Sequence, residues 1–264
     1  MSRMARVLII AGSDSGGGAG IQGDLKTVTC LGGYGMTAIT ALTAQNTLGV
    51  FGVHPVPEDF IAQQMTLCLE DIGADAIKTG MLHSAGVIDV VAANLPAGVP
   101  LVVDPVMVAK GGSPLLETQA LDALKTKLLP RAAIITPNLP EAELLLGRTI
   151  GESDAEIVDA VNQLLAFSCN AVLLKGGHGH ADVLTDVLLV HGKAPILIKT
   201  QRVETKHTHG TGCTLASAIA TGLAQELGME AAVRRAHAYV QTAIAAAPGL
   251  GQGHGPLGHG QALR

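Results

Sequence analysis

Short runs of apolar, often β-branched residues alternate along this chain with longer segments in which apolar residues recur every three or four positions. The first run, residues 7–11, ends at a glycine, and helical spacing then holds from residue 21 to residue 31. Short, bounded runs of this kind are typical of buried strands, whereas the longer periodic segments are typical of helices.

This pattern predicts an ordered series of elements. Further strands are expected at residues 74–79, 100–103, 132–136, 171–175, 183–190 and 196–203, with a pair inside 34–55 that turns around 46–49. Further helices are expected at residues 57–72, 84–94, 118–128, 139–146, 153–167, 211–227 and 230–246, and a loop at 249–260. Strands that alternate with helices predict an α/β fold with a doubly wound, mainly parallel sheet between two helical layers. Neither a repeat nor a linker divides the chain, so we predict a single domain over residues 1–264.

Composition narrows the class of protein. Trp is absent and Phe and Tyr are few, so the core must be aliphatic. A net charge of −5 without a Lys/Arg run argues against a nucleic-acid partner. No apolar stretch approaches the roughly 18 residues that span a bilayer, which argues against a membrane protein. Four scattered cysteines without a C-x-x-C pair indicate a reduced, cytoplasmic protein without a zinc site.

A loop that opens into a helix is the strongest candidate site. Residues 206–214 contain two glycines and run directly into a small, apolar, helix-forming segment. Backbone amides at a helix start have no partner inside the helix, so those of Thr211, Gly212 and Cys213 are expected to hold an anion such as phosphate. The same field is expected to lower the pKa of the Cys213 thiol. The alternative is an ordinary glycine-rich turn with a buried cysteine.

Three predicted strand ends carry polar residues that suit phosphate chemistry. Asp104 follows the strand at 100–103, and Asn138 and Glu141 follow the strand at 132–136. Carboxylate oxygens there offer ligands for Mg²⁺, although Asn138 and Glu141 are also spaced as a simple helix cap. Lys175 lies beside two glycines, and its ammonium group is expected to bind a phosphate. The alternative is an ordinary basic residue at the surface. His178, His180, His207 and His209 fit no familiar metal-site spacing.

Residues 18–23 match G-x-G-x-x-G, but the preceding strand ends too early and no acidic residue follows at the distance that a dinucleotide fingerprint requires. We therefore interpret this segment as a flexible substrate loop with Asp24 at hand, or with Asp24 simply at the surface. Charge neutralisation, Mg²⁺ and an anion-binding helix start are together what phosphoryl transfer requires.

These motifs closely resemble the ribokinase-like superfamily and, within it, the hydroxymethylpyrimidine/phosphomethylpyrimidine kinases of thiamine biosynthesis. Six stretches in the same order carry the resemblance: IAGSDSGGGAGIQGDLKT at 10–27, KTGML at 78–82, DPVMVAK at 104–110, TPNLPEA at 136–142, KGGH at 175–178 and THGTGCT at 208–214. Most sugar and nucleoside kinases of the superfamily end the last motif in Asp, where this chain has Cys213.

The resemblance implies a ribokinase-like three-layer fold and an ATP- and Mg²⁺-dependent kinase that acts twice. It would phosphorylate 4-amino-5-hydroxymethyl-2-methylpyrimidine and then convert that monophosphate to the diphosphate. The family is commonly dimeric, and residues 34–55 would form a small β lid and dimer contact. The rivals are a pyridoxal kinase of the same family, a non-catalytic pyrimidine-binding module and a dinucleotide oxidoreductase.

The resemblance also implies residue roles. The anion hole would consist of Gly210, Thr211, Gly212 and Cys213, with Cys213 as the base. Mg²⁺ would be bound by Asp104 and Glu141, and the phosphates of ATP would be contacted by Asn138, Lys175, Glu141 and Thr208. The aminopyrimidine would be recognised by Asp24 and Gln45 in a pocket lined by Gly80, Met81 and Val106. Gln45 stands where some relatives carry another residue.

Overall fold

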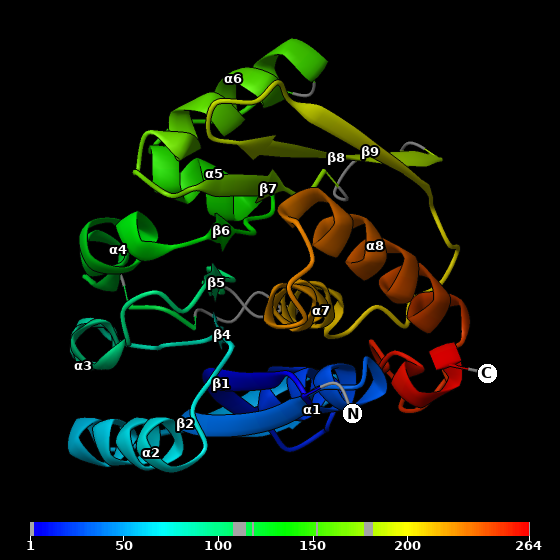
Figure 1. Cartoon of the computed structure of the whole chain (residues 1–264). Coiled ribbons are helices and arrows are strands. Elements are labelled where there is room, and N and C mark those ends of the chain that lie inside the picture. The colour runs from blue at the N-terminus through cyan, green and yellow to red at the C-terminus, as the bar shows by residue number, and fades with distance from the viewer. Residues whose placement is uncertain (1–2, 108–114, 118, 152, 177–181, 264) are drawn as a thin grey trace.

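A single twisted sheet forms the middle of the molecule, in a computed structural model that describes residues 3–107, 115–117, 119–151, 153–176 and 182–263 (Figure 1). Its nine strands in the described part of the chain follow the order β3-β2-β1-β4-β5-β6-β7-β8-β9. The strands are β1 (Arg6–Asp14), β2 (Tyr34–Asn46), β3 (Gly49–Pro55), β4 (Ala76–Thr79), β5 (Leu101–Val103), β6 (Ile134–Ile135), β7 (Ala171–Leu174), β8 (Val183–Val190) and β9 (Ile196–Gln201). The six strands from β2 to β7 in this order are parallel, whereas β3, β8 and β9 pair antiparallel.

Helices cover both faces of the sheet (Figure 1). One face carries α1 (Gly20–Cys30), α7 (Thr211–Ala224) and α8 (Met229–Ala245). The other carries α2 (Glu58–Asp71), α3 (Ala85–Asn94), α4 (Ala120–Ala123), α5 (Leu139–Leu146) and α6 (Asp154–Leu165). The predicted three-layer, doubly wound α/β fold is therefore confirmed.

Each face of the sheet buries its own aliphatic core. Ile10 and its neighbours pack toward α2 and α3, whereas Ile9 packs toward α7 and α8. Consecutive strand residues point to opposite faces, which explains why β1 is apolar without alternation. A fully buried Ile or Leu contributes roughly 1.5–3 kcal/mol, so this aliphatic core needs no aromatic residues.

The predicted element positions hold, while several boundaries move. β1 continues past the predicted end at residue 11 because Ser13 and Asp14 still pair with β2. The helix expected at 118–128 is a short α-helical turn from Ala120 that widens into a π-helical turn, Leu124–Leu128; residue 118 lies outside the described residues. The expected C-terminal loop ends in a 3-10 turn, His259–Leu263. None of the helices among the described residues combines the length and apolar character that crossing a bilayer requires.

Candidate active site

A cavity of about 800 Å³ lies along the carboxyl ends of the parallel strands. Ligands of open α/β sheets bind at this edge, because the loops that follow the strands converge there. Its lining includes Gln45 on β2 and Leu184 and Thr200 on β8 and β9, strands on opposite sides of the sheet. Its volume is at the upper end of that of small-molecule sites and suits two reactants.

The N-terminus of α7 opens into this cavity, as the sequence predicted. Gly210 caps the helix with φ of 86°, a left-handed conformation that favours glycine. A Cβ at Gly210 would also overlap the carbonyl oxygen of Gly18, so the two loops touch backbone to backbone. Thr211, Gly212 and Cys213 line the cavity, and the Thr211 amide makes only a long contact of 3.4 Å, to the carbonyl of Thr208. This helix start can therefore accept an anion from the cavity side.

Two of the predicted strand-end groups meet opposite this helix start. Lys175 Nζ lies 3.2 Å from Asp104 Oδ1, and a Cβ placed on Gly212 would lie 3.2 Å from the same ammonium group. Thr136 also donates a hydrogen bond of 3.1 Å to Asp104. Asp104 and Glu141 hold the pKa of Lys175 above its usual value against the opposing effect of burial. A permanent cation therefore faces the anion-binding amides.

Asn138 and Glu141 have both of the roles that the sequence left open. They form a reciprocal capping box at the start of α5, in which each side chain accepts a 2.8 Å bond from the backbone amide of the other. Both also line the cavity. Burial, reinforced by the charge of Asp104, raises the pKa of Glu141 to about 7. Two neighbouring carboxylates of this kind suit Mg²⁺, which usually takes one or two protein carboxylates together with substrate phosphates.

Cys213 lies at the predicted place, but the prediction of a lowered thiol pKa is wrong for the protein without ligands. Burial raises the pKa of Cys213 to about 12, and the nearby carboxylates of Asp24 and Asp104 act in the same direction. The Lys78 ammonium opposes them without overcoming them. The dipole of one helix start contributes less than the cost of burying a thiolate. The thiol is therefore protonated at neutral pH.

The prediction that Asp24 contacts the pyrimidine is not supported, and neither is a surface position. Asp24 is fully buried and does not line the cavity. Its carboxylate accepts a 2.8 Å hydrogen bond from Lys78 Nζ and one of 2.6 Å from Ser217 Oγ. Lys78 itself is fully buried beside the cavity. Sequence reasoning gave Lys78 no role, although a lysine inside an apolar strand was a signal that a buried partner must exist.

Asp14 is a second site residue that the sequence analysis missed. Its carboxylate accepts hydrogen bonds from the amides of Gly16, Gly18 and Ala19 at 2.8–3.0 Å, so the glycine loop wraps around it. Burial works against ionisation, but the bond from His209 and these amides lower the pKa of Asp14 overall. Because these loop amides donate to Asp14, they are not available to bind a pyrophosphate. The dinucleotide interpretation of G-x-G-x-x-G is therefore not supported. An Asp followed by glycines was the available signal.

His209 connects Asp14 to Gln45, the residue predicted to recognise the substrate. His209 Nε2 lies 2.8 Å from Asp14 Oδ2 and 3.2 Å from Gln45 Nε2, and all three residues line the cavity. These residues form a polar cluster, hereafter the acceptor cluster. Among the described residues no group of three or more His, Cys, Asp or Glu side chains is placed to hold a metal ion, and His178 and His180 lie outside those residues.

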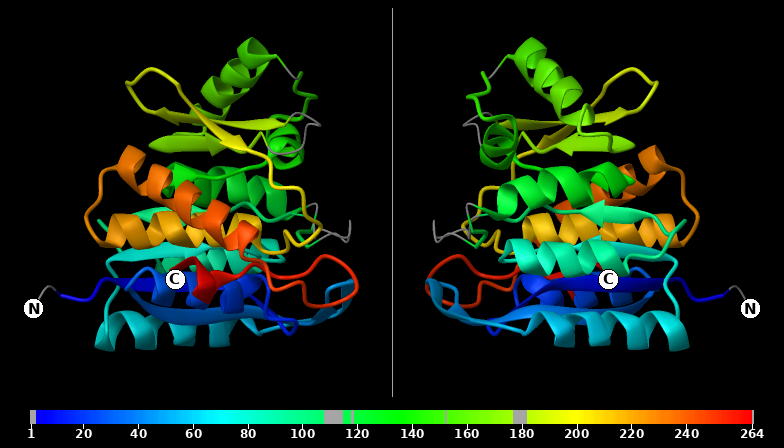
Figure 2. Two further views of the ribbon diagram at one scale, coloured as in Figure 1. Left: turned by 90° about the vertical axis from the view of Figure 1, so that its right-hand side faces the viewer. Right: turned by 90° about the vertical axis from the view of Figure 1, so that its left-hand side faces the viewer.

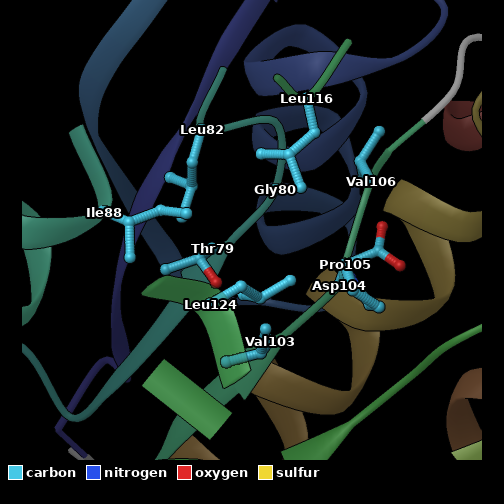
Figure 3. A pocket seen from close by; sticks show the side chains of 10 residues that line it. All are labelled: Thr79, Gly80, Leu82, Ile88, Val103, Asp104, Pro105, Val106, Leu116 and Leu124. Atoms are coloured by element: carbon cyan, nitrogen blue, oxygen red, sulfur yellow. The ribbon is translucent and has the colours of Figure 1, made fainter. Parts of the chain in front are cut away.

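The three predicted pocket-lining residues separate into two places. Met81 and Val106 line the main cavity. Gly80 instead borders a small adjoining cavity, mainly apolar, into which Val106 also reaches (Figure 3). A Cβ on Gly80 would lie 2.9 Å from Lys78 Nζ, which explains why a glycine stands there. The Asp104 carboxylate stands apart from the apolar side chains of this small cavity (Figure 3).

A mainly parallel α/β sheet, a helix start that opens into the cavity, an opposed lysine and two nearby carboxylates are the parts expected of a small-molecule kinase of ribokinase-like fold. The family model for phosphomethylpyrimidine kinase matches residues 14–258, and the chain belongs to this family.

Curated relatives agree with this assignment. The chain is 46% identical to the hydroxymethylpyrimidine/phosphomethylpyrimidine kinase of Haemophilus influenzae, over 98% of each protein. It is also 51% identical over 255 residues to the thiamine biosynthesis bifunctional protein ThiED of Geobacter sulfurreducens. That match covers 96% of this chain, which spans only about half (52%) of the bifunctional relative.

Solved structures share the fold. The ADP complex of Bacillus subtilis pyridoxal kinase is 35% identical with a TM-score of 0.89, covering 98% of both chains. The phosphomethylpyrimidine kinase of Clostridium difficile is 40% identical with a TM-score of 0.79, covering 91% of this chain and 99% of that one.

Proposed function

We propose that this chain is an ATP-dependent kinase that acts twice in thiamine biosynthesis. It phosphorylates the hydroxymethyl group of 4-amino-5-hydroxymethyl-2-methylpyrimidine and then converts that monophosphate to the diphosphate. The observation that carries this proposal is the convergence of the α7 N-terminus, Lys175 and Asp104 within one cavity, together with the family match over residues 14–258.

The reaction needs positioning and charge neutralisation more than covalent chemistry. We assign the amides of residues 210–213 and the Lys175 ammonium to the phosphoryl group in transfer. Asp104 and Glu141 would hold Mg²⁺, whose charge would neutralise the phosphate oxygens of ATP. Asn138 and Thr208, which line the same cavity, are placed near those phosphates.

Cys213 remains our candidate for the residue that accepts the hydroxyl proton, because it lies in the first turn of α7 beside the cavity. Because burial raises its pKa, the thiol must lose its proton before it can act as a base. In Cys213→Ala we expect the first phosphorylation to slow by at least about 100-fold, a typical contribution of general-base catalysis. The second step should change much less, since a phosphate acceptor is already ionised. Equal, small losses in both steps would exclude the base role.

For the acceptor ring we propose the end of the cavity that Gln45, Met81 and Val106 line. The amide of Gln45 offers both a donor and an acceptor, which matches the edge of an aminopyrimidine. Asp14 and His209 complete the polar side of this end, in the place first assigned to Asp24.

The decisive experiment is incubation with Mg-ATP and, separately, the hydroxymethylpyrimidine or pyridoxal, with products identified by mass. We expect the pyrimidine monophosphate and then the diphosphate, and a loss of about 10²–10³ in rate for Lys175→Met. Binding of the pyrimidine without ATP turnover would instead indicate a non-catalytic module.

Pyridoxal kinase activity is the second candidate, because the B. subtilis pyridoxal kinase has the same fold at 35% identity. Efficient phosphorylation of pyridoxal, with the pyrimidine left unchanged, would replace the main proposal. The higher identity of 46% to the H. influenzae hydroxymethylpyrimidine/phosphomethylpyrimidine kinase favours the pyrimidine.

We also propose that the chain forms a homodimer through the β2–β3 hairpin. This hairpin carries the exposed apolar side chains Phe51 (71%), Leu48 (60%) and Leu42 (45%), and exposed apolar residues gathered in one region mark protein–protein contacts.

A further inference from the structure

The last turns of the chain run back across the molecule to the acceptor end of the cavity. After α8 ends at Ala245, residues 250–259 form a segment that we call the C-terminal strap. Figure 2 shows it, in red, extending to the tip of the β2–β3 hairpin, in light blue. The strap itself does not line the main cavity. Any effect on catalysis must therefore act through the residues that it holds.

The strap is bonded to the tip of the hairpin. The amide of His254 donates a 2.9 Å hydrogen bond to the carbonyl of Thr47, and the amide of Gly253 donates one of 3.2 Å to the Thr47 hydroxyl. Thr47 follows Gln45 by two residues. The position of the Gln45 amide is thus tied to the strap.

It is also bonded to the loop before α7. The amide of His209 donates a 3.1 Å hydrogen bond to the carbonyl of Gly255, and Lys206 Nζ donates one of 3.3 Å to the carbonyl of Gln252. Pro256 lies against Gly18 of the glycine loop: a Cβ placed on Gly18 would lie 3.2 Å from the Pro256 Cβ. All three loops that supply the acceptor cluster therefore contact this one segment.

His259 anchors the far end of the strap on α7. Its Nε2 lies 2.9 Å from the hydroxyl of Thr214, the residue directly after Cys213, and both side chains are buried. The Tyr239 hydroxyl of α8 donates to the His259 carbonyl at 3.2 Å. One end of the strap thus contacts the first turn of α7, which we assign to the anion hole, and the other end contacts the β2–β3 hairpin.

We propose that the C-terminal strap is a positioning element for the acceptor substrate: through Thr47, His209 and Thr214 it fixes the acceptor cluster relative to the anion hole. The inference rests on the proposed function for the identity of the acceptor. The opposite side of the cavity is lined by Leu184 and Thr200 of β8 and β9, and none of the backbone hydrogen bonds found among the described residues joins either of them to the strap. A displacement of the strap at the hairpin should therefore affect binding of the acceptor more than binding of the nucleotide.

Two glycines of the same tail provide a matched test. A Cβ at Gly253 would overlap the backbone carbonyl of Thr47, so Gly253→Ala pushes the strap off the hairpin. A Cβ at Gly260 meets nothing within 4 Å, so Gly260→Ala makes the same chemical change without that effect. His259→Gln is a second variant that alters the α7 anchor and leaves the glycines intact.

Steady-state kinetics and amide hydrogen exchange are measured on the full chain. In Gly253→Ala we expect KM for the pyrimidine to rise at least about fivefold, since small misplacements of binding groups cost this much or more. KM for ATP should stay within about twofold, and Gly260→Ala should match the unmodified protein in both. Exchange at residues 15–19 and 46–48 should quicken in Gly253→Ala, while that of β7 stays unchanged.

Unchanged exchange in both loops, or equal rises of the two KM values, would overturn the proposal. If the unmodified protein does not phosphorylate the pyrimidine, the proposed function fails, and the exchange comparison still decides whether the strap holds the loops.

Discussion

The most informative single residues of this site are ionisable groups held away from water. Asp24 and Lys78 are both fully buried, and their 2.8 Å pair lies beneath the cavity. Such pairs add little net stability, yet removing one partner leaves an uncompensated charge. The pair thus limits which substitutions are tolerated at these two buried positions beneath the cavity.

Lys78→Met should lower the free energy of unfolding by about 3–5 kcal/mol, because it leaves the Asp24 carboxylate buried without its counter-ion. The double variant Lys78→Met/Asp24→Asn should recover part of this loss, since the charge is removed from both partners. Urea unfolding of both variants measures the difference. Equal stability of the single variant and the unmodified protein would show that the carboxylate finds another partner or takes up a proton.

Cys213 offers a test of its raised pKa. Alkylation by iodoacetamide, located by mass spectrometry, should be at least about 100-fold slower at pH 7.5 than for an exposed thiol, because only the thiolate reacts. The rate should still be rising at pH 10, since the pKa is raised to about 12. A plateau below pH 8 would contradict this.

At the level of elements, the fold was predicted more completely than the candidate site, and the difference has a physical reason. Aliphatic runs and helical spacing identify β1 and α7, because the buried positions of strands and helices recur at regular intervals along the sequence. The strand ends placed Asp104 and Lys175 together because parallel strands share one edge. Asp14 and His209 lie 195 residues apart and meet through loops, and loops have no such period. The strap was predicted as a loop, and its contacts could not be predicted for the same reason.

The anchor of the strap predicts a dependence of stability on pH. Burial, helped by the charge of Lys26, lowers the pKa of His259 from its usual 6.5 to about 4. The unfolded chain therefore binds more protons between these values. The contribution of His259 is fully present above about pH 6.5 and is lost as the pH falls toward 4.

Between pH 7 and pH 5, His259 should account for a loss of about 2 kcal/mol in the free energy of unfolding. In His259→Gln this part of the loss should disappear, which urea unfolding at the two pH values can measure. An identical loss in both proteins would mean that His259 does not stay neutral in the folded state. Other buried groups, His237 among them, contribute equally to both proteins and cancel in the comparison.

For the molecule as a whole, the exposed hairpin surface predicts self-association. Phe51→Asp replaces the most exposed of these apolar side chains with a charge, so we expect a dimer of the unmodified protein to become a monomer in light scattering. Glu58→Gln on the adjacent helix is a control that leaves Phe51, Leu48 and Leu42 in place. A monomeric unmodified protein would refute the proposed dimer. Localisation in the cytoplasm is a separate point and stays a prediction.

The sheet has an antiparallel part on each side, β2–β3 and β8–β9, which we call its wings. Their separation has a consequence for how the substrate preference of such an enzyme can change in evolution. The hairpin β2–β3 carries Gln45 at one margin, and β8–β9 carry Leu184 and Thr200 at the other, with the buried parallel strands between them. β3 and β9 are the two edge strands of the sheet. Under the proposed function, in which Gln45 recognises the ring, ring preference could therefore change through substitutions in the hairpin without altering β8 and β9.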